Sequence, residues 1–426
     1  MQIIDKIIKD NRNGKAVAIP SICSAHPSVL KASLLLAKMQ NKPLLVEATS
    51  NQVNQYGGYT GMTPVDFIEF VYDICDDIGL AHDMVIFGGD HLGPQAWRAE
   101  PAEIAMEKAI ILVTDYVQAG FRKIHLDCSE GCKGEPAQVG DDLAASRAAV
   151  LAKACENAIS DPENLRYIVG TEVPPPGGAR AEDDEMSVVP TLPEHAKITI
   201  VKHQQAFEAL GIAQVWPKTI GLVLQPGLEF APDHIFPFDM AQPNQLSAIL
   251  AGHNGLCFEA HSTDYQNSAV YADIAKRNFA IHKVGPALTF AYRKAIYGLV
   301  AVENWLDTKP SQQVPEVMET LMLENSQYWL NHYQGDEQNL KALRHFGYAD
   351  RIRYYWTQDA AKSSVISLMK NLDCPKPVAS LLGQYFPADI VSLASGLENE
   401  DVSWAEALII AEIQHALMPY FEVYSV

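Results

Sequence analysis

Ionisable and amide side chains follow a series of short apolar runs along this chain, at the point where each run ends. Asp90 and His91 follow MVIFGG, Asp127 follows KIHL, and His261 follows GLCFEA. A carboxylate beside an imidazole can supply both a metal ligand and a group that moves a proton, because neutral imidazole binds zinc and a carboxylate accepts protons. These residue types predict either a divalent-metal site or a hydrogen-bonded polar network.

Other runs end in the same way and add further candidates. These are Glu47 after PLLV, Glu172 after YIVGT, Gln225 after GLVL, Glu259 within GLCFEA, and Lys283 and Gly285 after FAIH. We expect His91, Glu172 and His261 to be the ligands of a zinc site with an open position. If the chain catalyses a reaction of its own, Asp90 and Glu172 are the candidate acid and base. The candidate substrate-binding residues are Glu47, Asp127, Gln225, Glu259, Lys283 and Gly285.

A Gly-Pro pair, Gly285 and Pro286, lies between Lys283 and a helix predicted to begin near Thr289. A helix N-terminus with a lysine nearby is where barrels often bind phosphate, through backbone N–H groups and the helix dipole. The alternative is a tight turn with no ligand. The sequence contains no G-x-x-x-x-G-K-[ST] loop and no kinase signature set, so it predicts no nucleotide site.

The apolar runs define the elements that must position these side chains. Each is bounded by Gly, Pro or polar residues, as expected of a strand buried on both faces of a parallel sheet. Strands are predicted to begin near residues 16, 43, 84, 123, 166, 219, 255 and 279. The intervals between them have the length that crossover helices need. Eight such units predict a (β/α)8 TIM barrel, whose active sites lie at the C-terminal ends of the strands.

Helical patterns fill most intervals and continue after the last strand. The interval 174–218 opens with PPPGGARAEDDE, which predicts a loop at the barrel mouth before a helix over 193–211. Beyond residue 309, helices are predicted over 313–333, 337–345, 358–372 and 403–420. We therefore divide the chain into a TIM barrel, residues 1–308, and a helical C-terminal extension, residues 309–426. The stretch 348–358, YADRIRYYWTQ, is rich in arginine and aromatic residues, typical of an interface or of a segment that docks the extension on the barrel.

Composition indicates a soluble, cytoplasmic protein. The net charge of −20 argues against nucleic acid or an anionic membrane as a partner, because both need a basic face. No stretch approaches the roughly 18 apolar residues of a transmembrane helix. Seven cysteines, spread over the 426 residues, do not form a disulfide pattern, so we expect reduced thiols.

Long strings of this sequence resemble one known family. They are CSAHP (23–27), EATSNQVNQYGGYTGMTP (47–64), GGDHLGP (88–94), KIHLDCS (123–129), GTEVPPPGG (170–178), QPGLEF (225–230), EAHSTDYQ (259–266), KVGPALTFAYRKA (283–295) and DRIRYYW (350–356). On these strings the chain resembles the non-catalytic subunit family of D-tagatose-1,6-bisphosphate aldolase, over nearly its full length. Some members of that family are labelled tagatose 6-phosphate kinase.

The resemblance implies a TIM barrel related to the zinc-dependent class II aldolases, acting in galactitol or N-acetylgalactosamine catabolism, where tagatose 6-phosphate is degraded. Members are understood to stabilise and activate a catalytic class II subunit, in a chaperone-like role, without aldolase activity of their own. A class II aldolase holds zinc through three histidines, with an acid beside the first. Here Asp90 and His91 match the acid-histidine pair and His261 matches a later ligand. By strand order, Gln225 stands where a histidine would be expected, and an amide oxygen is a weaker ligand for zinc.

Two functions follow from these observations. The first is a non-catalytic subunit that stabilises and activates a class II tagatose-bisphosphate aldolase, with a sugar phosphate as a candidate ligand. The second is an autonomous metal-dependent aldolase, epimerase or isomerase of sugar phosphates that uses His91, Glu172 and His261. Full-length resemblance favours the first, and the density of polar residues at the mouth favours the second.

Overall fold

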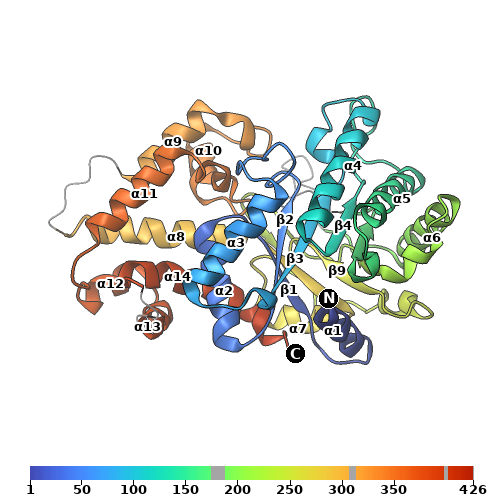
Figure 1. Cartoon of the computed structure of the whole chain (residues 1–426). Helices are drawn as coiled ribbons and strands as arrows, with labels where there is room; N and C mark the ends of the chain where they lie inside the picture. Colours follow the sequence, from blue (N-terminus) through green and yellow to red (C-terminus); the bar gives the residue numbers. More distant parts are fainter. Residues whose placement is uncertain (174–187, 307–312, 398–401, 426) are drawn as a thin grey trace.

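A closed barrel of eight parallel strands forms the centre of the computed structural model, which describes residues 1–173, 188–306, 313–397 and 402–425 (Figure 1). Around the barrel the strands follow in the order β1, β10, β9, β6, β5, β4, β3 and β2. Their bounds are β1 Ile19–Cys23, β2 Leu44–Thr49, β3 Val85–Leu92, β4 Lys123–Asp127, β5 Arg166–Gly170, β6 Thr219–Val223, β9 Cys257–Ala260 and β10 Phe279–Val284. This arrangement confirms the predicted TIM barrel.

The strands are buried on both faces, as their apolar composition requires. Leu44, Leu45 and Val46 of β2 have no solvent exposure, and burying one such side chain stabilises the fold by about 1.5–3 kcal/mol. The parallel register sets Glu47 beside Gly88 on β3, and Asp127 of β4 beside Gly170 on β5. Since every strand runs in the same direction, the polar residues that end the strands gather at one rim of the barrel.

Helices α2 to α7 surround the barrel where the crossovers were predicted. They are α2 Pro27–Gln40, α3 Pro64–Ile78, α4 Ala102–Ala119, α5 Asp141–Ala158, α6 Pro193–Ala209 and α7 Ser268–Lys276. Local sequence sets their ends, as α3 illustrates. Thr63 accepts a hydrogen bond from the backbone of Asp66, whose carboxylate accepts one from the Thr63 backbone, and Gly79 ends the helix in the left-handed conformation. The predicted mouth loop, residues 174–185, lies outside the described residues.

The interval between β6 and β9 carries no α-helix, although its length leaves room for the crossover helix of a (β/α)8 unit. It contains a short antiparallel pair, β7 (Glu229–Phe230) and β8 (Ile235–Phe236), and a 3-10 turn, Ser247–Leu250. Prolines at positions 226, 232, 237 and 243 explain the difference. Proline lacks an N–H donor and clashes with the preceding helical turn, so none of the segments between them is long enough for a helix.

An N-terminal helix, α1 (Gln2–Arg12), lies at the rim opposite the polar strand ends. Arg12 donates hydrogen bonds to the carbonyls of Leu250 and Leu256, which precede β9, at 2.9 and 2.5 Å. Asn11 donates to the carbonyl of Ala275, before β10, at 2.7 Å. The helix therefore anchors the N-terminal ends of the strands and leaves the polar rim open.

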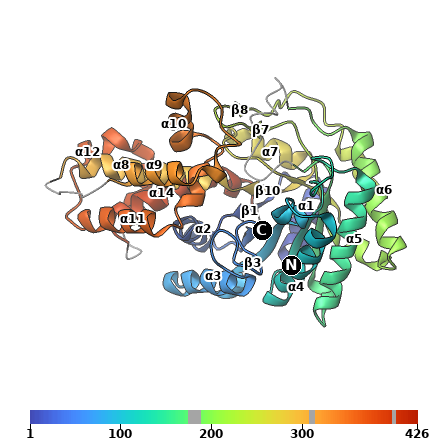
Figure 2. The ribbon, with the colours of Figure 1, turned by 90° about the horizontal axis from the view of Figure 1, so that it is seen from above.

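The C-terminal extension is helical, as predicted, and in both views it extends to one side of the barrel (Figures 1 and 2). The helix after the last strand, α8 Pro286–Glu303, belongs to the barrel, and the elements of the extension are α9 Val314–Glu324, α10 Glu337–Phe346, α11 Asp359–Asn371, α12 Ala379–Tyr385, α13 Ala388–Leu397 and α14 Trp404–Glu422. The helix predicted over 313–333 ends early, because Asn325 leaves the helical conformation and caps a following 3-10 turn. Helices α12 and α13 were not predicted.

The last helix, α14, returns to the barrel wall and contacts β1, α2, α7 and α8. Tyr424 donates a hydrogen bond to the carbonyl of Pro43 at 2.6 Å, and Gln414 donates to the carbonyl of Ala32 at 3.1 Å. The Tyr420 ring lies 4.2 Å from that of Tyr271 on α7. The division of the chain at residue 308 remains a prediction, and these contacts tie the far end of the extension to the first strands of the barrel.

Candidate functional site

Nine ionisable side chains meet at the polar rim of the barrel, and we call them the mouth cluster. They are Glu47, Asp90, His91, Lys123, His125, Asp127, Glu259, His261 and Lys283. All are buried, with at most 4 % of each residue exposed. Burying so many charges is costly unless they pair with one another, so the geometry of the pairs determines the chemistry of the cluster.

Two lysines neutralise the carboxylates at the base of the cluster. The Lys123 ammonium lies 2.6 Å from Glu47 and 2.7 Å from Glu259. The Lys283 ammonium contacts the other oxygen of Glu47 and lies 2.8 Å from Asp90. Burial opposes the charge of each lysine, but the neighbouring carboxylates outweigh it and raise both lysine pKa values. Both lysines therefore remain protonated and act as cations rather than as nucleophiles.

Two histidines at the rim are each held by a carboxylate. His91 Nδ1 lies 2.7 Å from Asp127, and His261 Nε2 lies 2.9 Å from Glu259. A carboxylate only accepts hydrogen bonds, so the proton lies on the bonded nitrogen and His91 Nε2 and His261 Nδ1 are left as acceptors. Burial lowers the pKa of His261 to about 4. Burial also opposes the charge of His91, but Asp90 and Asp127 outweigh it and raise its pKa.

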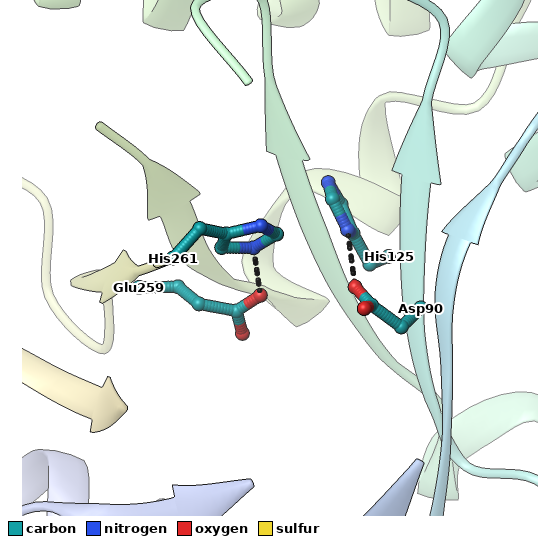
Figure 3. A group of neighbouring side chains, drawn as sticks. All are labelled: Asp90, His125, Glu259 and His261. Carbon is teal, nitrogen blue, oxygen red and sulfur yellow. Dashed lines mark hydrogen bonds and ion pairs between the residues drawn. The ribbon is translucent and has the colours of Figure 1, made fainter. Parts of the chain in front are cut away.

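A third imidazole, His125 of β4, completes a triangle of histidines. Ring centroids are 5.2 Å apart for His91 and His125, 5.0 Å for His91 and His261, and 5.2 Å for His125 and His261. His125 Nδ1 lies 3.0 Å from Asp90 Oδ1 and 3.2 Å from the His91 backbone nitrogen. The Asp90 contact requires a proton on Nδ1 and leaves Nε2 as an acceptor, whereas the hydrogen bond from the His91 backbone N–H requires a lone pair on Nδ1 and places the proton on Nε2. Figure 3 shows this pair facing the pair formed by Glu259 and His261.

The backbone at the end of β3 is held in an unusual conformation. His91 has φ = 47°, in the left-handed region that non-glycine residues seldom adopt. Ser50 donates a hydrogen bond to the His91 carbonyl at 2.8 Å, and Gln95 donates to the same oxygen. Strained residues that their surroundings hold in place are concentrated at functional sites. His91 contacts Asp127 from this conformation, and its positive φ marks the end of β3 as a candidate functional position.

Two imidazoles and two carboxylates of the mouth cluster form a group that fits a divalent metal ion, and His91, predicted as a ligand, is not in this group. One ligand atom from each of Asp90, His125, Glu259 and His261 lies within 4.8 Å of the other three. His125 Nε2 is buried and has no hydrogen-bond partner in the described part of the chain. Carboxylates that orient metal-binding histidines are usual around zinc. Asp90 and Glu259, by contrast, are already paired with lysines, so a metal would have to compete for them.

A cavity of about 390 Å³ opens above the cluster, between the barrel and the C-terminal extension. Asp90, His91, His261 and Lys283 line its inner part, and residues of the 348–358 stretch line its outer part. That stretch packs inward, with the Tyr354 ring 4.9 Å from Tyr59 of the barrel. These contacts agree with its role as a docking segment between the extension and the barrel.

With this geometry in hand, the comparisons with known proteins are informative. The family model described as D-tagatose-1,6-bisphosphate aldolase subunit GatZ/KbaZ-like matches residues 4–424. The chain belongs to this family. A crystal structure described as a probable tagatose 6 phosphate kinase from Sinorhizobium meliloti 1021 is 41 % identical, covers 95 % of this chain and 100 % of its own, and superposes with a TM-score of 0.85.

Two solved aldolases are more distant. The YdjI aldolase from Escherichia coli K12 is 10 % identical over 85 % of this chain and 98 % of its own, with a TM-score of 0.41. The fructose-bisphosphate aldolase from Campylobacter jejuni is 13 % identical over 86 % of this chain and 91 % of its own, with a TM-score of 0.44. At these TM-scores neither match adds to the functional argument.

Two of the predicted site residues lie away from the mouth cluster of this GatZ/KbaZ-like chain. Glu172, predicted as a metal ligand, lies two residues beyond β5 and pairs with His195 at 3.0 Å, with its side chain 35 % exposed. Gln225 uses its side-chain oxygen to accept hydrogen bonds from the backbone of Gly227 and Leu228, at 2.9 and 3.1 Å. The roles predicted for Glu172 and Gln225 remain predictions, and neither residue belongs to the group of four potential ligands.

The predicted phosphate position at Gly285 is occupied by a side chain of this protein. Asp264 Oδ1 accepts hydrogen bonds from the backbone N–H groups of Gly285 and Ala287, at 3.1 and 2.9 Å. Burial raises the pKa of Asp264 to about 6. A carboxylate thus fills the anion position at the N-terminus of α8, and a phosphate could bind these N–H groups only by displacing Asp264.

Proposed function

We propose that this chain is the non-catalytic subunit of a class II D-tagatose-1,6-bisphosphate aldolase and that it stabilises and activates the catalytic subunit. Its place is in galactitol or N-acetylgalactosamine catabolism, where tagatose 6-phosphate is degraded, and its compartment is the cytoplasm. Membership of the GatZ/KbaZ-like family supports the role of an aldolase subunit. No helix in the described residues is long and apolar enough to cross a membrane.

The main structural support for the non-catalytic role is that the side-chain oxygen of Gln225 already accepts two hydrogen bonds. At the position where strand order predicts a third zinc-binding histidine, its amide oxygen is engaged by two backbone N–H groups of its own loop. A neutral amide oxygen already engaged in this way is a poor zinc ligand. The lysines that pair with Asp90 and Glu259 add to the effect, because they supply positive charge beside two of the four potential metal ligands.

Co-expression with a class II tagatose-bisphosphate aldolase tests this proposal. Binding to the folded enzyme stabilises it by mass action, so the thermal midpoint and the specific activity of the enzyme should both rise with the concentration of this chain. The purified chain alone should cleave no tagatose 1,6-bisphosphate. The proposal fails if saturating amounts of the chain change neither the midpoint nor the activity.

The three-histidine triangle favours a second candidate, an autonomous metal-dependent enzyme acting on sugar phosphates. His91 and His261 belong to the predicted metal set, and His125 supplies a third imidazole whose Nε2 has no hydrogen-bond partner among the described residues. Bound zinc would supply a Lewis acid. Asp90, beside His91, and Glu172 are the candidate acid and base in this reading.

Metal analysis of the purified chain, with and without its partner, separates the two candidates. An enzyme of the second kind should carry about one equivalent of divalent metal, retained in His195→Ala and lost in His125→Ala and His261→Ala. His195 is a suitable control because its imidazole pairs with Glu172, outside the cluster. A support subunit should activate its partner nearly as well with His261→Ala as without it. Absence of metal from the parent chain would eliminate the second candidate.

A further inference from the structure

The outer part of the mouth cavity contains an arginine with unused hydrogen-bonding capacity. Arg353 Nη1 donates to the carbonyls of Ala349 and Asp350, and Nη2 donates to the Tyr354 hydroxyl at 2.9 Å. A guanidinium has five N–H donors, so its Nε–H and one Nη2–H have no acceptor among the described residues. Nε and Nη2 lie on the side of a guanidinium that binds carboxylates and phosphates in a bidentate manner.

The positive charge of Arg353 is also without an ion pair in the described part of the chain. The nearest acidic residue in sequence, Asp350, pairs instead with Arg293 at 3.6 Å and accepts a hydrogen bond from Thr289 at 2.5 Å. Lys362 lines the same cavity and, like Arg353, has no ion pair in the described part of the chain. The two carboxyl groups of the lining, Asp90 and Asp264, are engaged by Lys283 and by backbone N–H groups. The guanidinium and the ammonium therefore give this cavity wall a positive charge that favours an anion.

The other anion position of the cavity is not available in this structure. The N–H groups at the start of α8 bind the Asp264 carboxylate, as described above. An anionic group entering the cavity therefore meets free donors at Arg353 and already engaged donors at Gly285 and Ala287. The anionic group should therefore bind Arg353, on the cavity wall formed by the C-terminal extension, rather than the N-terminus of α8.

The inner part of the cavity is suited to hydroxyl groups. Asp90 and the imidazoles of His91 and His261 line it and combine a carboxylate acceptor with ring nitrogens. Thr49, Gln52 and Ser24 add neutral donors and acceptors nearby. A volume of about 390 Å³ lies within the 300–1,000 Å³ typical of small-molecule sites.

We propose that this cavity binds a phosphorylated sugar or polyol, with its phosphate on Arg353 and its hydroxyl groups on Asp90, His91 and His261. The C-terminal extension thereby completes a ligand site on the barrel. The ligand binds the isolated chain, so the site does not depend on the presence of an aldolase partner.

Calorimetric titration of the purified full chain tests the site with three probes: a ketohexose 6-phosphate, the same ketohexose without phosphate, and inorganic phosphate. The phosphorylated sugar should bind most tightly. Arg353→Gln should weaken that binding about 10- to 100-fold, as expected for loss of charge-assisted hydrogen bonds, and leave any binding of the free sugar nearly unchanged. Arg353→Lys, which keeps the charge but not the paired donors, should give an intermediate loss.

Arg351→Gln is the matched control. Arg351 lies two residues away, stacks on the same Tyr354 ring at 4.8 Å, and donates to the carbonyl of Tyr328 at 2.5 Å, but it does not line the cavity. Circular dichroism and thermal midpoints establish whether each variant is folded. If Arg353→Gln does not fold, the affinity of Arg353→Lys for the phosphorylated sugar tests the proposal instead. The proposal is overturned if the parent binds none of the probes, if both Arg353 variants bind like the parent, or if Arg351→Gln loses as much affinity.

Discussion

Replacing Lys123 with methionine tests whether the lysines hold the mouth cluster together. The side chain of Lys123 is fully buried between Glu47 and Glu259, which are also fully buried. Methionine has a similar length and fills most of the same space, so the change removes the charge with little change in packing. It leaves Glu259 with only His261 as a partner and leaves Glu47 dependent on Lys283.

The expected cost follows from the burial of the pair. Removing one partner of a buried ion pair typically destabilises a protein by about 3–5 kcal/mol, because an uncompensated charge remains. An unfolding entropy of about 2.1 cal/mol/K per residue gives roughly 0.9 kcal/mol/K for 426 residues. The thermal midpoint of Lys123→Met should therefore fall by about 3–6 °C.

The pH dependence identifies the cause of this loss. In the parent, burial opposes the charge of Glu259, but Lys123, Lys283 and His261 together outweigh it and hold the pKa of that carboxyl below its usual range, with Lys123 the largest of the three. Without Lys123 the buried carboxyls bind protons more tightly when folded than when unfolded, so the stability of the variant falls as pH rises. The deficit, measured by calorimetry or circular dichroism, should be larger at pH 8 than at pH 5.

Two comparisons make the test decisive. Lys108→Met removes a lysine that pairs with Glu100 near the surface and should cost no more than about 1 kcal/mol. Adding Glu259→Gln to Lys123→Met should recover part of the loss, since it removes the orphaned charge. A deficit that is the same at both pH values, or that Glu259→Gln deepens, would mean that packing rather than charge accounts for it.

Three further changes probe the frame around the cluster. Asp264→Asn should stabilise the chain at pH 8. A folded pKa of about 6 against an ordinary 3.8 means that keeping Asp264 ionised in the folded state costs about 3 kcal/mol at that pH. The gain in thermal midpoint should disappear below pH 4, and equal midpoints of parent and variant at pH 8 would contradict the prediction. Gly88→Ala should destabilise the mouth, because a Cβ there would lie 2.6 Å from Glu47, and thermal midpoints measure the loss. A fragment lacking residues 404–426 should fail to give soluble, folded protein, because α14 covers β1 and α2; a stable fragment would instead support a boundary at residue 308.

The barrel and much of its mouth could be predicted from the sequence for a simple reason. Strands buried on both faces leave continuous apolar runs, and the polar residue that ends each run must reach the same rim. Asp90, His91, Asp127, His261 and Lys283 all lie in the mouth cluster on that basis. Glu172 does not, because it lies beyond its strand and turns toward His195.

The two residues that the prediction missed lie before the C-terminal end of their strand, Lys123 as the first residue of β4 and His125 within it. Lys123, His125 and Asp127 alternate along β4, so all three face the same side of the strand. That spacing was the available signal, since three ionisable residues in a row on one face are costly unless they meet partners. A pattern in one segment could not identify those partners, because Glu47, Asp90 and Glu259 come from three other strands.

The contacts between the helices of the extension and the barrel also could not be predicted from the sequence. The pattern over 403–420 predicted a helix, and α14 is present, but its position depends on residues more than 350 positions earlier, such as Ala32 and Pro43. The missing helix between β6 and β9, by contrast, had a local signal in its four prolines. Local sequence signals predict where helices and strands begin and end. Which elements pack against one another depends on how the closed barrel brings distant segments together.

The charges of the mouth cluster show why proton and metal binding should compete there. Its four carboxylates are Glu47, Asp90, Asp127 and Glu259, and its two lysines are Lys123 and Lys283. With neutral imidazoles, two negative charges are left over in a buried site, where unpaired charges are costly. Either protons on the imidazoles or a divalent cation can reduce that cost. Because coordination requires neutral imidazoles, metal content should rise with pH if the triangle binds a metal, and a content near zero at every pH would leave the proton as the counter-charge.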